Sequence, residues 1–378
     1  MEKTIISMSK RCTGCTACAS LCPVEAITMV LNKEGFLEPH VDAKTCISCG
    51  KCLKICPLND EGGYSRQQSF YGWHRDKAAR ENSTSGGAVR AVADEILKKG
   101  GIVYGAVYAD DFRSVHFGSS DDYTMEAIQK SKYMVSNPTG IYPQVKAQLK
   151  QGRPVLFTGA PCQVAGLKTY LAQDYDNLLT VDFVCGGMAS LAFWQEHITA
   201  LERKFGAPVC HVDFRSKKNG WGKCLLKIDF QNGKERCCRE YLDTYYKCFA
   251  EEHVSVRETC LRCSFAHRHY ADITVADFWG YRSAGVTEVG KGLSLIISNT
   301  DKGVHTVKHA ENLEQFCLDA KYATYAVRKA NPSQKQLNSR DKFFAAAEAA
   351  GFENAANKLY PANYWRHTVK WIRQKIKK

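Results

Sequence analysis

Cys12-x2-Cys15-x2-Cys18-x3-Cys22-Pro23 and Cys46-x2-Cys49-x2-Cys52-x3-Cys56-Pro57 are two copies of one pattern, and they decide the fold of the N-terminal segment. A cysteine at every third position lets a tight loop hold three corners of an iron–sulfur cube, while the fourth cysteine reaches the other cube. The pattern therefore predicts two 4Fe-4S clusters. Set 1 consists of Cys12, Cys15, Cys18 and Cys56, and set 2 consists of Cys22, Cys46, Cys49 and Cys52.

Zinc and disulfides are the alternatives for these eight cysteines. Zinc sites rarely use four cysteines so closely spaced and followed by proline, and a disulfide framework suits a short secreted domain. The start of the chain, Met1–Ser9, has no extended apolar stretch, and no apolar run reaches the length of a membrane span. We therefore expect a reducing, cytoplasmic location.

The chain of 378 residues is much longer than a dicluster segment requires, and its hydrophobic content of 44% is that of a globular protein with a substantial core. Its formal charge of +13 falls by about 4 with two clusters and by about 6 with three, because each cluster with four thiolates carries two negative charges. The basic residues form no recognisable nucleic-acid module, so no nucleic-acid partner is expected.

Strand-like and helix-like stretches alternate after a linker at 59–63, which predicts a mixed α/β or α+β body. A hairpin is expected to turn at Asn232-Gly233, and Ser190 is expected to cap a helix. The other expected strands lie at 102–108, 155–157, 178–185, 273–276 and 293–298, and the other expected helices begin after 83–87, near 141 and after 162.

Four further cysteines lie at loop-like positions, and we call them set 3: Cys162, Cys185, Cys260 and Cys263. From spacing alone, three chemistries fit them. They are a third 4Fe-4S cluster, a zinc site that also uses His267 and His269, and a catalytic thiol at Cys162. The remaining six are expected to be packing residues or surface thiols: Cys210, Cys224, Cys237, Cys238, Cys248 and Cys317.

Two glycine-rich stretches suggest phosphate binding. Ser85-Gly86-Gly87 at a helix start suits a phosphate or pyrophosphate, although Ser-Gly is also a common helix cap. Gly285-x4-Gly290-Lys291 imitates a P-loop, but Gly292 replaces the Ser or Thr that would hold magnesium, and a strand follows where a helix is required. Nucleotide hydrolysis is therefore excluded.

Six stretches in order resemble the beta-subunit family of coenzyme F420 hydrogenases and dehydrogenases, in the version with an N-terminal dicluster ferredoxin domain. They are Glu81–Gly87, Ser131–Tyr133, Val155–Leu167, Asp182–Gly186, Cys260–Cys263 and Ala271–Gly280. One departure is Cys185-Gly186-Gly187, where the family commonly has Cys-His-Gly, so any role of that histidine is lost. The family's members reduce different substrates, so the resemblance names none for this chain.

The resemblance implies FAD and a third 4Fe-4S cluster, on set 3. Ser85, Gly86 and Gly87 are the candidates for the flavin pyrophosphate, with Lys132 as a charge partner and Thr158 near the ring. The implied domains are a dicluster ferredoxin-type domain at 1–60, a flavin-binding domain at 64–145, a domain with the third cluster at 146–320 and a helical basic tail at 321–378.

The expected function is that of an iron–sulfur flavoprotein oxidoreductase, which couples hydride chemistry at the flavin to one-electron transfer through the clusters. The alternative is a non-catalytic subunit that passes electrons to a separate enzyme. The expected partners are a one-electron protein such as ferredoxin and an organic substrate or a deazaflavin donor. Relatives suggest a service to polysaccharide biosynthesis. The basic segment Tyr364–Lys378 suits a membrane surface on the cytoplasmic side or a partner groove, and equally a helix packed on the body.

Overall fold

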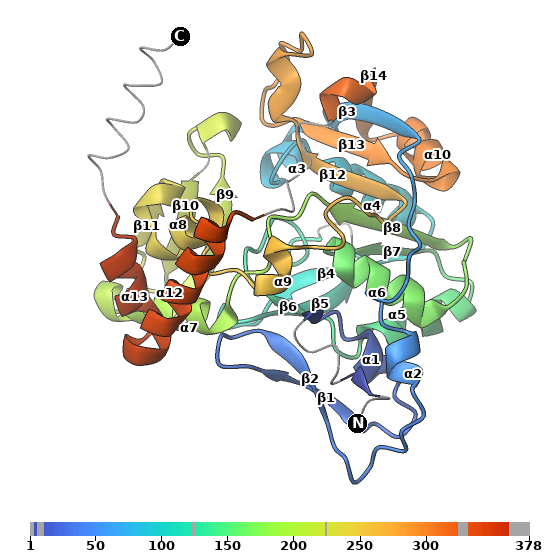
Figure 1. Ribbon diagram of the computed structural model, residues 1–378. Helices are drawn as coiled ribbons and strands as arrows, with labels where there is room; N and C mark the ends of the chain where they lie inside the picture. Colours follow the sequence, from blue (N-terminus) through green and yellow to red (C-terminus); the bar gives the residue numbers. More distant parts are fainter. Residues whose placement is uncertain (1–3, 6–10, 123–124, 224, 324–331, 363–378) are drawn as a thin grey trace.

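One large sheet forms the centre of the protein (Figure 1). The computed structural model describes residues 4–5, 11–122, 125–223, 225–323 and 332–362. Within this part of the chain, nine strands form a sheet in the order β14-β3-β13-β12-β8-β7-β4-β5-β6. The predicted mixed α/β fold with an N-terminal ferredoxin-type segment is confirmed.

The middle of this sheet is parallel. Strands β12 (Ile273–Asp277), β8 (Leu178–Phe183), β7 (Val155–Thr158) and β4 (Ile102–Tyr108) are paired in parallel, each with the next. Strand β3 (Gln68–His74) runs in the same direction as β12, because both are antiparallel to β13 (Ser294–Ser298) between them. The carboxyl ends of all five parallel-running strands therefore meet at one edge of the sheet, which we call the carboxyl edge.

Helices cover both faces, as the buried strands require. In β7, Val155 and Phe157 pack with α5 (Ile141–Lys150) and α6 (Pro161–Leu171), whereas Leu156 packs on the opposite face with α4 (Ala88–Lys98). Successive side chains of a strand point to opposite faces, so a strand buried on both sides is apolar throughout.

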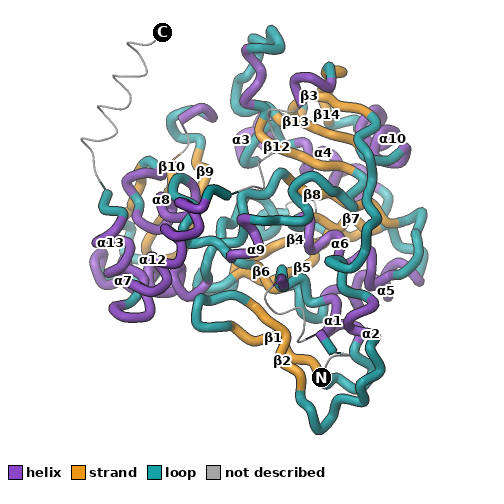
Figure 2. Tube along the Cα trace, viewed as in Figure 1, coloured by secondary structure: helices purple, strands orange, loops and turns teal. Residues whose placement is uncertain are grey.

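The N-terminal segment packs beside α5 and α6 at the lower end of the molecule in Figures 1 and 2. It contains a two-stranded antiparallel sheet and two short helices. These elements are α1 (Ala17–Leu21), β1 (Ile27–Leu31), β2 (Leu37–Val41) and α2 (Lys51–Lys54).

A second lobe lies beside the large sheet and surrounds an antiparallel three-stranded sheet. The oxygen of Ser190 accepts a hydrogen bond from the Phe193 amide and caps α7, as predicted. The predicted hairpin at Asn232-Gly233 is also confirmed. The elements of this lobe are α7 (Leu191–Phe205), β9 (Val209–Ser216), β10 (Leu225–Phe230), β11 (Glu235–Cys238), α8 (Thr244–Ala250), α12 (Gln334–Ala350) and α13 (Phe352–Leu359).

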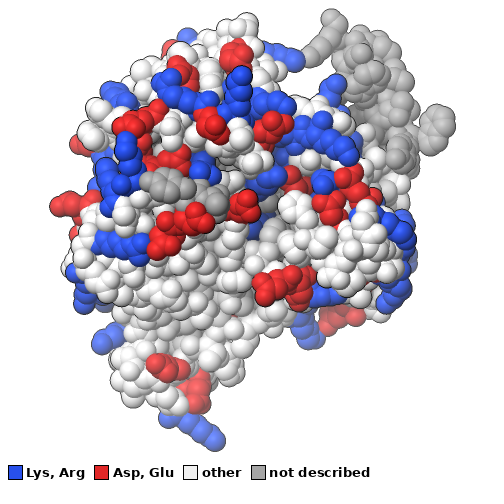
Figure 3. All heavy atoms as spheres, turned by 180° about the vertical axis from the view of Figure 1, so that it is seen from behind, with Lys and Arg blue, Asp and Glu red and all other residues white. Residues whose placement is uncertain are grey.

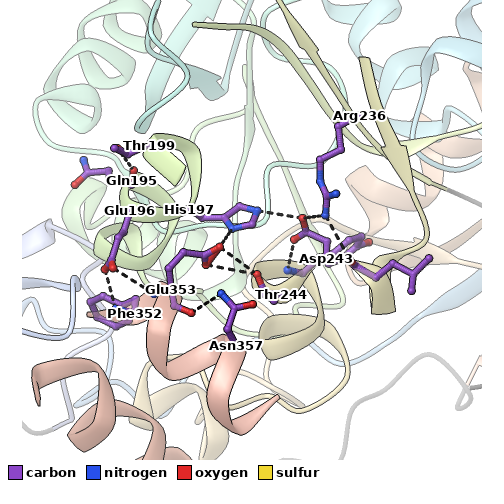
Figure 4. A network of polar contacts seen from close by, with 12 residues as sticks. Gln195, Glu196, His197, Thr199, Arg236, Asp243, Thr244, Phe352, Glu353 and Asn357 are labelled. Carbon is purple, nitrogen blue, oxygen red and sulfur yellow. Dashed lines mark hydrogen bonds and ion pairs between the residues drawn. The ribbon is translucent and has the colours of Figure 1, made fainter. Parts of the chain in front are cut away.

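A buried polar network joins α13 to this lobe (Figure 4). His197 on α7 contacts Glu353 on α13 through Nδ1 at 2.9 Å and Asp243 before α8 through Nε2 at 3.0 Å. Arg236 on β11 donates to the same Asp243 carboxylate at 2.8 Å. The helices near the end of the chain are thus bound to the body by ion pairs as well as by apolar packing.

The remaining elements complete the sheet and its connections. They are α3 (Lys77–Asn82), β5 (Val115–Ser120), β6 (Ser136–Asn137), α9 (Glu258–Leu261), α10 (Asp301–His309), β14 (Leu313–Leu318) and α11 (Ala320–Ala323). No helix in the described ranges is both long and apolar enough to cross a bilayer. Helices α11, α12 and α13 agree with the predicted helical C-terminal part, whereas the basic segment at 364–378 lies outside the described residues.

Candidate functional site

The two cysteine-rich loops of the N-terminal segment have the same backbone conformation. In the first loop Gly14 and Thr16 flank Cys15 with φ of 73° and 66°, and in the second loop Ser48 and Gly50 flank Cys49 with φ of 52° and 71°. A left-handed residue on each side of the central cysteine turns the chain sharply. The duplicated spacing thus corresponds to a duplicated loop shape.

The sulfurs of set 1 lie together. Burial raises the pKa of Cys15 to about 12, and the neighbouring Cys12 and Cys56 raise it further because thiolates repel one another. The pKa of Cys18 is also raised, by burial first and then by Cys15, Cys12 and Cys56. Four buried sulfurs that would repel one another as thiolates fit a positively charged iron core, which would supply the compensating charge.

All four cysteines of set 2 line one cavity, together with Pro23 and Ile47. This cavity lies near the surface, because Cys49 is exposed and the Ile47 side chain beside it is 61% exposed. Cys56 of set 1 has a raised pKa, caused mainly by burial but also by Cys12 of its own set and by Cys52 of set 2. Sets 1 and 2 are therefore neighbours.

Set 3 also converges, although its members come from distant parts of the chain. The pKa of Cys162 is well above its ordinary value because of burial and, after that, because of Cys263, Cys185 and Cys260. Cys162 begins α6 after β7, and Cys185 follows β8, so the carboxyl edge brings these two together. A Cβ on Gly187 would lie 3.3 Å from Cys260 Cβ, which shows how closely the loop after β8 approaches the segment that carries Cys260.

The donors that the structure gathers at set 3 are sulfurs. His269 is hydrogen bonded through Nδ1 to the buried Asp182 at 2.9 Å, and His267 is exposed. Among the described residues, no group of three or more Cys, His, Asp or Glu has the close arrangement that holds a single metal ion. Ligands of a four-iron cube stand farther apart than ligands of one ion, so this arrangement favours the cube over zinc.

A catalytic thiol at Cys162 is disfavoured by the same geometry. The thiolate is the reactive form of cysteine, and reactive cysteines lie in electropositive, partly exposed surroundings that lower the pKa. Burial and three cysteine neighbours raise the pKa of Cys162 instead.

Backbone amides point at sulfurs in all three sets. The amides of Gly14 and Gly187 donate to Cys12 and Cys185 at 3.3 Å, and the Met188 amide donates to Cys260 at 3.4 Å. In set 2 the Ala26 amide donates to Cys22 at 3.3 Å. Such hydrogen bonds stabilise thiolates and influence the potentials of iron–sulfur clusters. The donor chemistry therefore fits clusters at all three sets.

The other cysteines occupy ordinary positions. Cys248 is buried in the second lobe, whereas Cys210 and Cys317 are exposed on β9 and β14. Cys237 and Cys238 are half-buried on β11, and Cys224 lies outside the described residues.

The predicted pyrophosphate loop, Ser85–Gly87, lies at the carboxyl edge. The Gly86 carbonyl accepts from the His74 amide at the end of β3, and Gly87 has a φ of 92° as it leads into α4. The Gly86 amide donates to Ser294 Oγ at 3.0 Å, and Ser85 Oγ donates to the Leu293 carbonyl at 2.8 Å. Part of the donor capacity of this loop is therefore used within the protein.

Lys132 lies close to the same loop but is turned inward. Its ammonium donates to the carbonyls of Gln129 at 2.9 Å and Ile128 at 3.4 Å, and it lies over the Tyr108 ring. Burial lowers the pKa of Lys132 to about 7, and the nearby Lys130 lowers it further. The two predicted stretches still meet, because the Ser131 amide donates to Thr84 Oγ1 at 3.0 Å. Thr158, at the end of β7, is half-buried, and its methyl group approaches Gly105 on β4.

Sequence reasoning missed several residues at the carboxyl edge. Lys217 Nζ donates to the Ser85 carbonyl at 2.6 Å, and the Arg215 guanidinium forms an ion pair with Asp277 at 2.8 Å. Trp279 is 55% exposed and stacks on the buried Trp221 with 4.4 Å between ring centroids. Only Asp277 and Trp279 fell within a quoted motif, and β9, which carries Arg215, belongs to the other sheet, so no local pattern could have revealed this cluster.

Three all-cysteine sites at the junction of a ferredoxin-type segment and an α/β body define an iron–sulfur electron-transfer protein of oxidoreductase type. The sequence comparisons agree. Residues 11–59 match a family described as 4Fe-4S dicluster domain, and residues 152–322 match one described as the C terminus of the coenzyme F420 hydrogenase/dehydrogenase beta subunit. The chain is therefore related to the beta subunits of coenzyme F420 hydrogenases and dehydrogenases and carries an N-terminal 4Fe-4S dicluster domain.

One solved structure with a similar fold is a chain of the F420-reducing [NiFe] hydrogenase complex from Methanosarcina barkeri, studied by xenon derivatization. It is 16% identical in sequence, the match covers 75% of this chain and 94% of that chain, and the TM-score is 0.48. No curated protein matches significantly.

Proposed function

We propose that the chain is a flavin- and iron–sulfur-dependent oxidoreductase that couples two-electron chemistry to the transfer of single electrons. The observation that carries this proposal is the convergence of set 3 at the carboxyl edge, because the Ser85–Gly87 loop lies at the same edge and set 1 adjoins α6. When bound, a flavin accepts an electron pair as a hydride and returns single electrons, and 4Fe-4S clusters carry single electrons.

Set 3 would hold a third 4Fe-4S cluster, beside those of sets 1 and 2. The buried, mutually repelling sulfurs and the amides of Gly187 and Met188 support this assignment. The corresponding domains are 1–60, 64–145, 146–320 and 321–378. The large sheet takes strands from both middle segments, so these two would function as one body.

Ser85, Gly86 and Gly87 would hold the pyrophosphate of an FAD. Support comes from their position at the N-terminus of α4, where free amides and the helix dipole favour an anion, and from the left-handed Gly87. Lys132 would act by positioning the turn at 128–132 rather than by direct charge pairing, since backbone carbonyls receive its hydrogen bonds. Thr158 would lie near the ring system, at the end of β7.

A one-electron protein such as ferredoxin would exchange electrons at set 2. Support comes from the exposure of Cys49 and Ile47 and from three exposed lysines nearby, Lys44, Lys51 and Lys54. An acidic carrier would be attracted to such a surface. The two-electron reactant would be an organic substrate or a deazaflavin, and a service to polysaccharide biosynthesis in the cytoplasm, at the membrane or away from it, remains a prediction.

A non-catalytic electron-transfer subunit is the second candidate. It is favoured by one observation, namely that the matching family is described as a beta subunit, and such a subunit receives its electrons from another chain. The two candidates differ in whether the purified chain alone oxidises a hydride donor.

Anaerobic purification tests both. We expect about twelve irons and one FAD per chain, and about four irons with the FAD after removal of residues 1–60. The full chain is then screened with NADH, reduced F420 and reduced ferredoxin. Flavin reduction by a hydride donor supports the oxidoreductase, and flavin that responds only to a protein donor supports the subunit. A folded, truncated protein with flavin but no iron would contradict the third cluster.

A further inference from the structure

Helix α6 connects set 3 to set 1 within one helical turn. Cys162 of set 3 lies at its start, and Gly166 lies one turn later on a surface that faces the Cys12–Cys18 loop. A Cβ on Gly166 would lie 3.0 Å from Cys15 Cβ and 3.1 Å from Cys15 Sγ. Side-chain carbons are rarely found this close to their neighbours, so glycine is what permits the helix to approach the Cys15 sulfur.

A buried tyrosine closes the same contact from α5. The hydroxyl of Tyr142 lies 2.7 Å from the Cys15 carbonyl and 2.9 Å from the Gln163 carbonyl, and it can donate to either. Tyr142 is fully buried, and its hydroxyl would lie 3.0 Å from a Cβ on Gly166. One side chain thus bridges the backbone next to Cys162 and the backbone of Cys15 itself.

A second bridge comes from the loop that leads to Cys260. The Arg257 guanidinium and the Thr259 hydroxyl each donate to the Cys12 carbonyl at 3.2 Å. Arg257 is only 4% exposed and also donates to the Leu37 carbonyl at 2.8 Å. Two separate segments that carry set 3 therefore grip the loop that carries set 1, and a buried cation lies at the contact.

Set 1 also adjoins set 2, since Cys52 is among the neighbours of Cys56. Set 1 is thus the set in contact with both of the others.

We infer that the contact among α6, Tyr142 and the Cys12–Cys18 loop is the one-electron junction between the body and the N-terminal segment, with Gly166, Tyr142 and Arg257 as its positioning residues. This inference rests on the proposed function, because it requires clusters at sets 1 and 3. One electron crosses at a time, so one site is oxidised by one electron, the other is reduced by one, and no proton moves. The resulting order along the chain of sites is set 3, set 1, set 2.

The test uses the full chain, reconstituted anaerobically, with Gly166→Ala and Gly166→Leu. The matched control is Gly118→Ala on β5, because a Cβ there would be equally crowded, 3.1 Å from Val107, but its nearest neighbours include no cysteine. We expect about twelve irons in all proteins. In the Gly166 variants, magnetic coupling between the reduced clusters in electron paramagnetic resonance weakens, and reduction of the N-terminal clusters through the body slows several-fold.

Two outcomes separate the inference from the proposed function. About eight irons in the unaltered chain would overturn the third cluster and the junction together. About twelve irons in Gly166→Leu with unchanged coupling would overturn the junction alone.

Tyr142→Phe provides a milder variant should Gly166→Leu fail to fold. We expect it to keep its iron and to shift the midpoint potential of the set 1 cluster, because the hydroxyl that orders the Cys15 carbonyl is lost. The control is Tyr245→Phe, which removes a comparable hydrogen bond of 2.7 Å to the Tyr133 carbonyl. An unshifted potential and unchanged coupling in Tyr142→Phe would overturn the positioning role.

Discussion

The N-terminal segment and the second lobe are stabilised by different means. The apolar cluster within the N-terminal segment contains only Ile5 and Ile27 as fully buried aliphatic residues, and its other buried members are Cys18 and Cys56. The second lobe instead buries a large apolar core that includes Phe193, Trp194, Phe214 and Tyr245. The first region therefore depends on its cofactors for stability, and the second depends on packed side chains.

The difference explains how one chain can combine them. A loop that wraps a cluster needs few residues, so the N-terminal segment places its sites close to the surface, where Cys49 is exposed. The body needs strands and helices from distant parts of the chain to assemble set 3, and these same elements bury it. The exposed sites suit exchange with a partner protein, and the buried site suits chemistry that must be kept from solvent.

Loss of a cluster ligand should have the largest effect, and only on the first region. We expect Cys15→Ser to lose about four irons and to make residues 11–59 sensitive to proteases, because metal binding supplies much of the folding free energy of such segments. The body, with its own core, should resist proteolysis. Iron analysis and limited proteolysis measure this.

The matched control is Cys210→Ser, which changes an exposed cysteine on β9. It should keep all iron and the protease resistance of the unaltered protein. An N-terminal segment that stays protease-resistant without iron would contradict its dependence on the clusters.

A core truncation should have the opposite distribution. Phe193 is fully buried and contacts the rings of Tyr245, Phe343 and Phe352, so Phe193→Ala should lower the free energy of unfolding of the body by about 3–5 kcal/mol. Its iron content under native conditions should be unchanged. Urea unfolding followed by tryptophan fluorescence checks the first statement, and Phe316→Ala on the 40% exposed Phe316 of β14 is the control. A loss of iron in proportion to the loss of stability would show that the two regions are not independent.

The sequence predicted the first region far better than the second. The spacing of sets 1 and 2 is local, so the pairing of cysteines and even the repeated loop shape follow from the chain itself. Set 3 could only be grouped through a family resemblance, because Cys162 and Cys260 are brought together by strand order, which no local pattern encodes. Gly166, Tyr142 and Arg257 were not foreseen at all, since their significance lies in what they contact across the fold.

Alkaline pH should weaken the second region through His197. The folded-state pKa of His197 is about 9, since burial lowers it but Asp243 and Glu353 raise it more. A pKa raised by folding stabilises the folded state fully below its ordinary value of 6.5, and this stabilisation is lost as the pH rises through about 9. The free energy of unfolding should fall by on the order of 2–3 kcal/mol over that interval.

Asp243 acts in the opposite direction. Its pKa is lowered because His197 and Arg236 outweigh burial, so its contribution is lost only as the pH falls through the acid range. Urea unfolding of His197→Gln should therefore show a flatter pH dependence between pH 6.5 and 9, whereas His309→Gln, which changes an exposed histidine of α10, should not. An equal slope in the unaltered protein and in His197→Gln would contradict this account of Figure 4.

The smallest effect should come from the charges around set 2. Figure 3 shows acidic and basic side chains intermixed over the upper rear face and few charges over the lower end, where the N-terminal segment lies. Lys44, Lys51 and Lys54 are exposed there, and exposed Asp42 offsets part of their charge. Replacing all three lysines by glutamine should lower electron exchange with an acidic ferredoxin roughly tenfold at low salt, and much less above the ionic strength at which such charges are screened. Lys308→Gln, on α10, is the control, and iron content should be unchanged in both proteins. Stopped-flow rates measured against ionic strength decide the matter, and equal rates in the triple variant and the control at low salt would mean that the partner docks away from set 2.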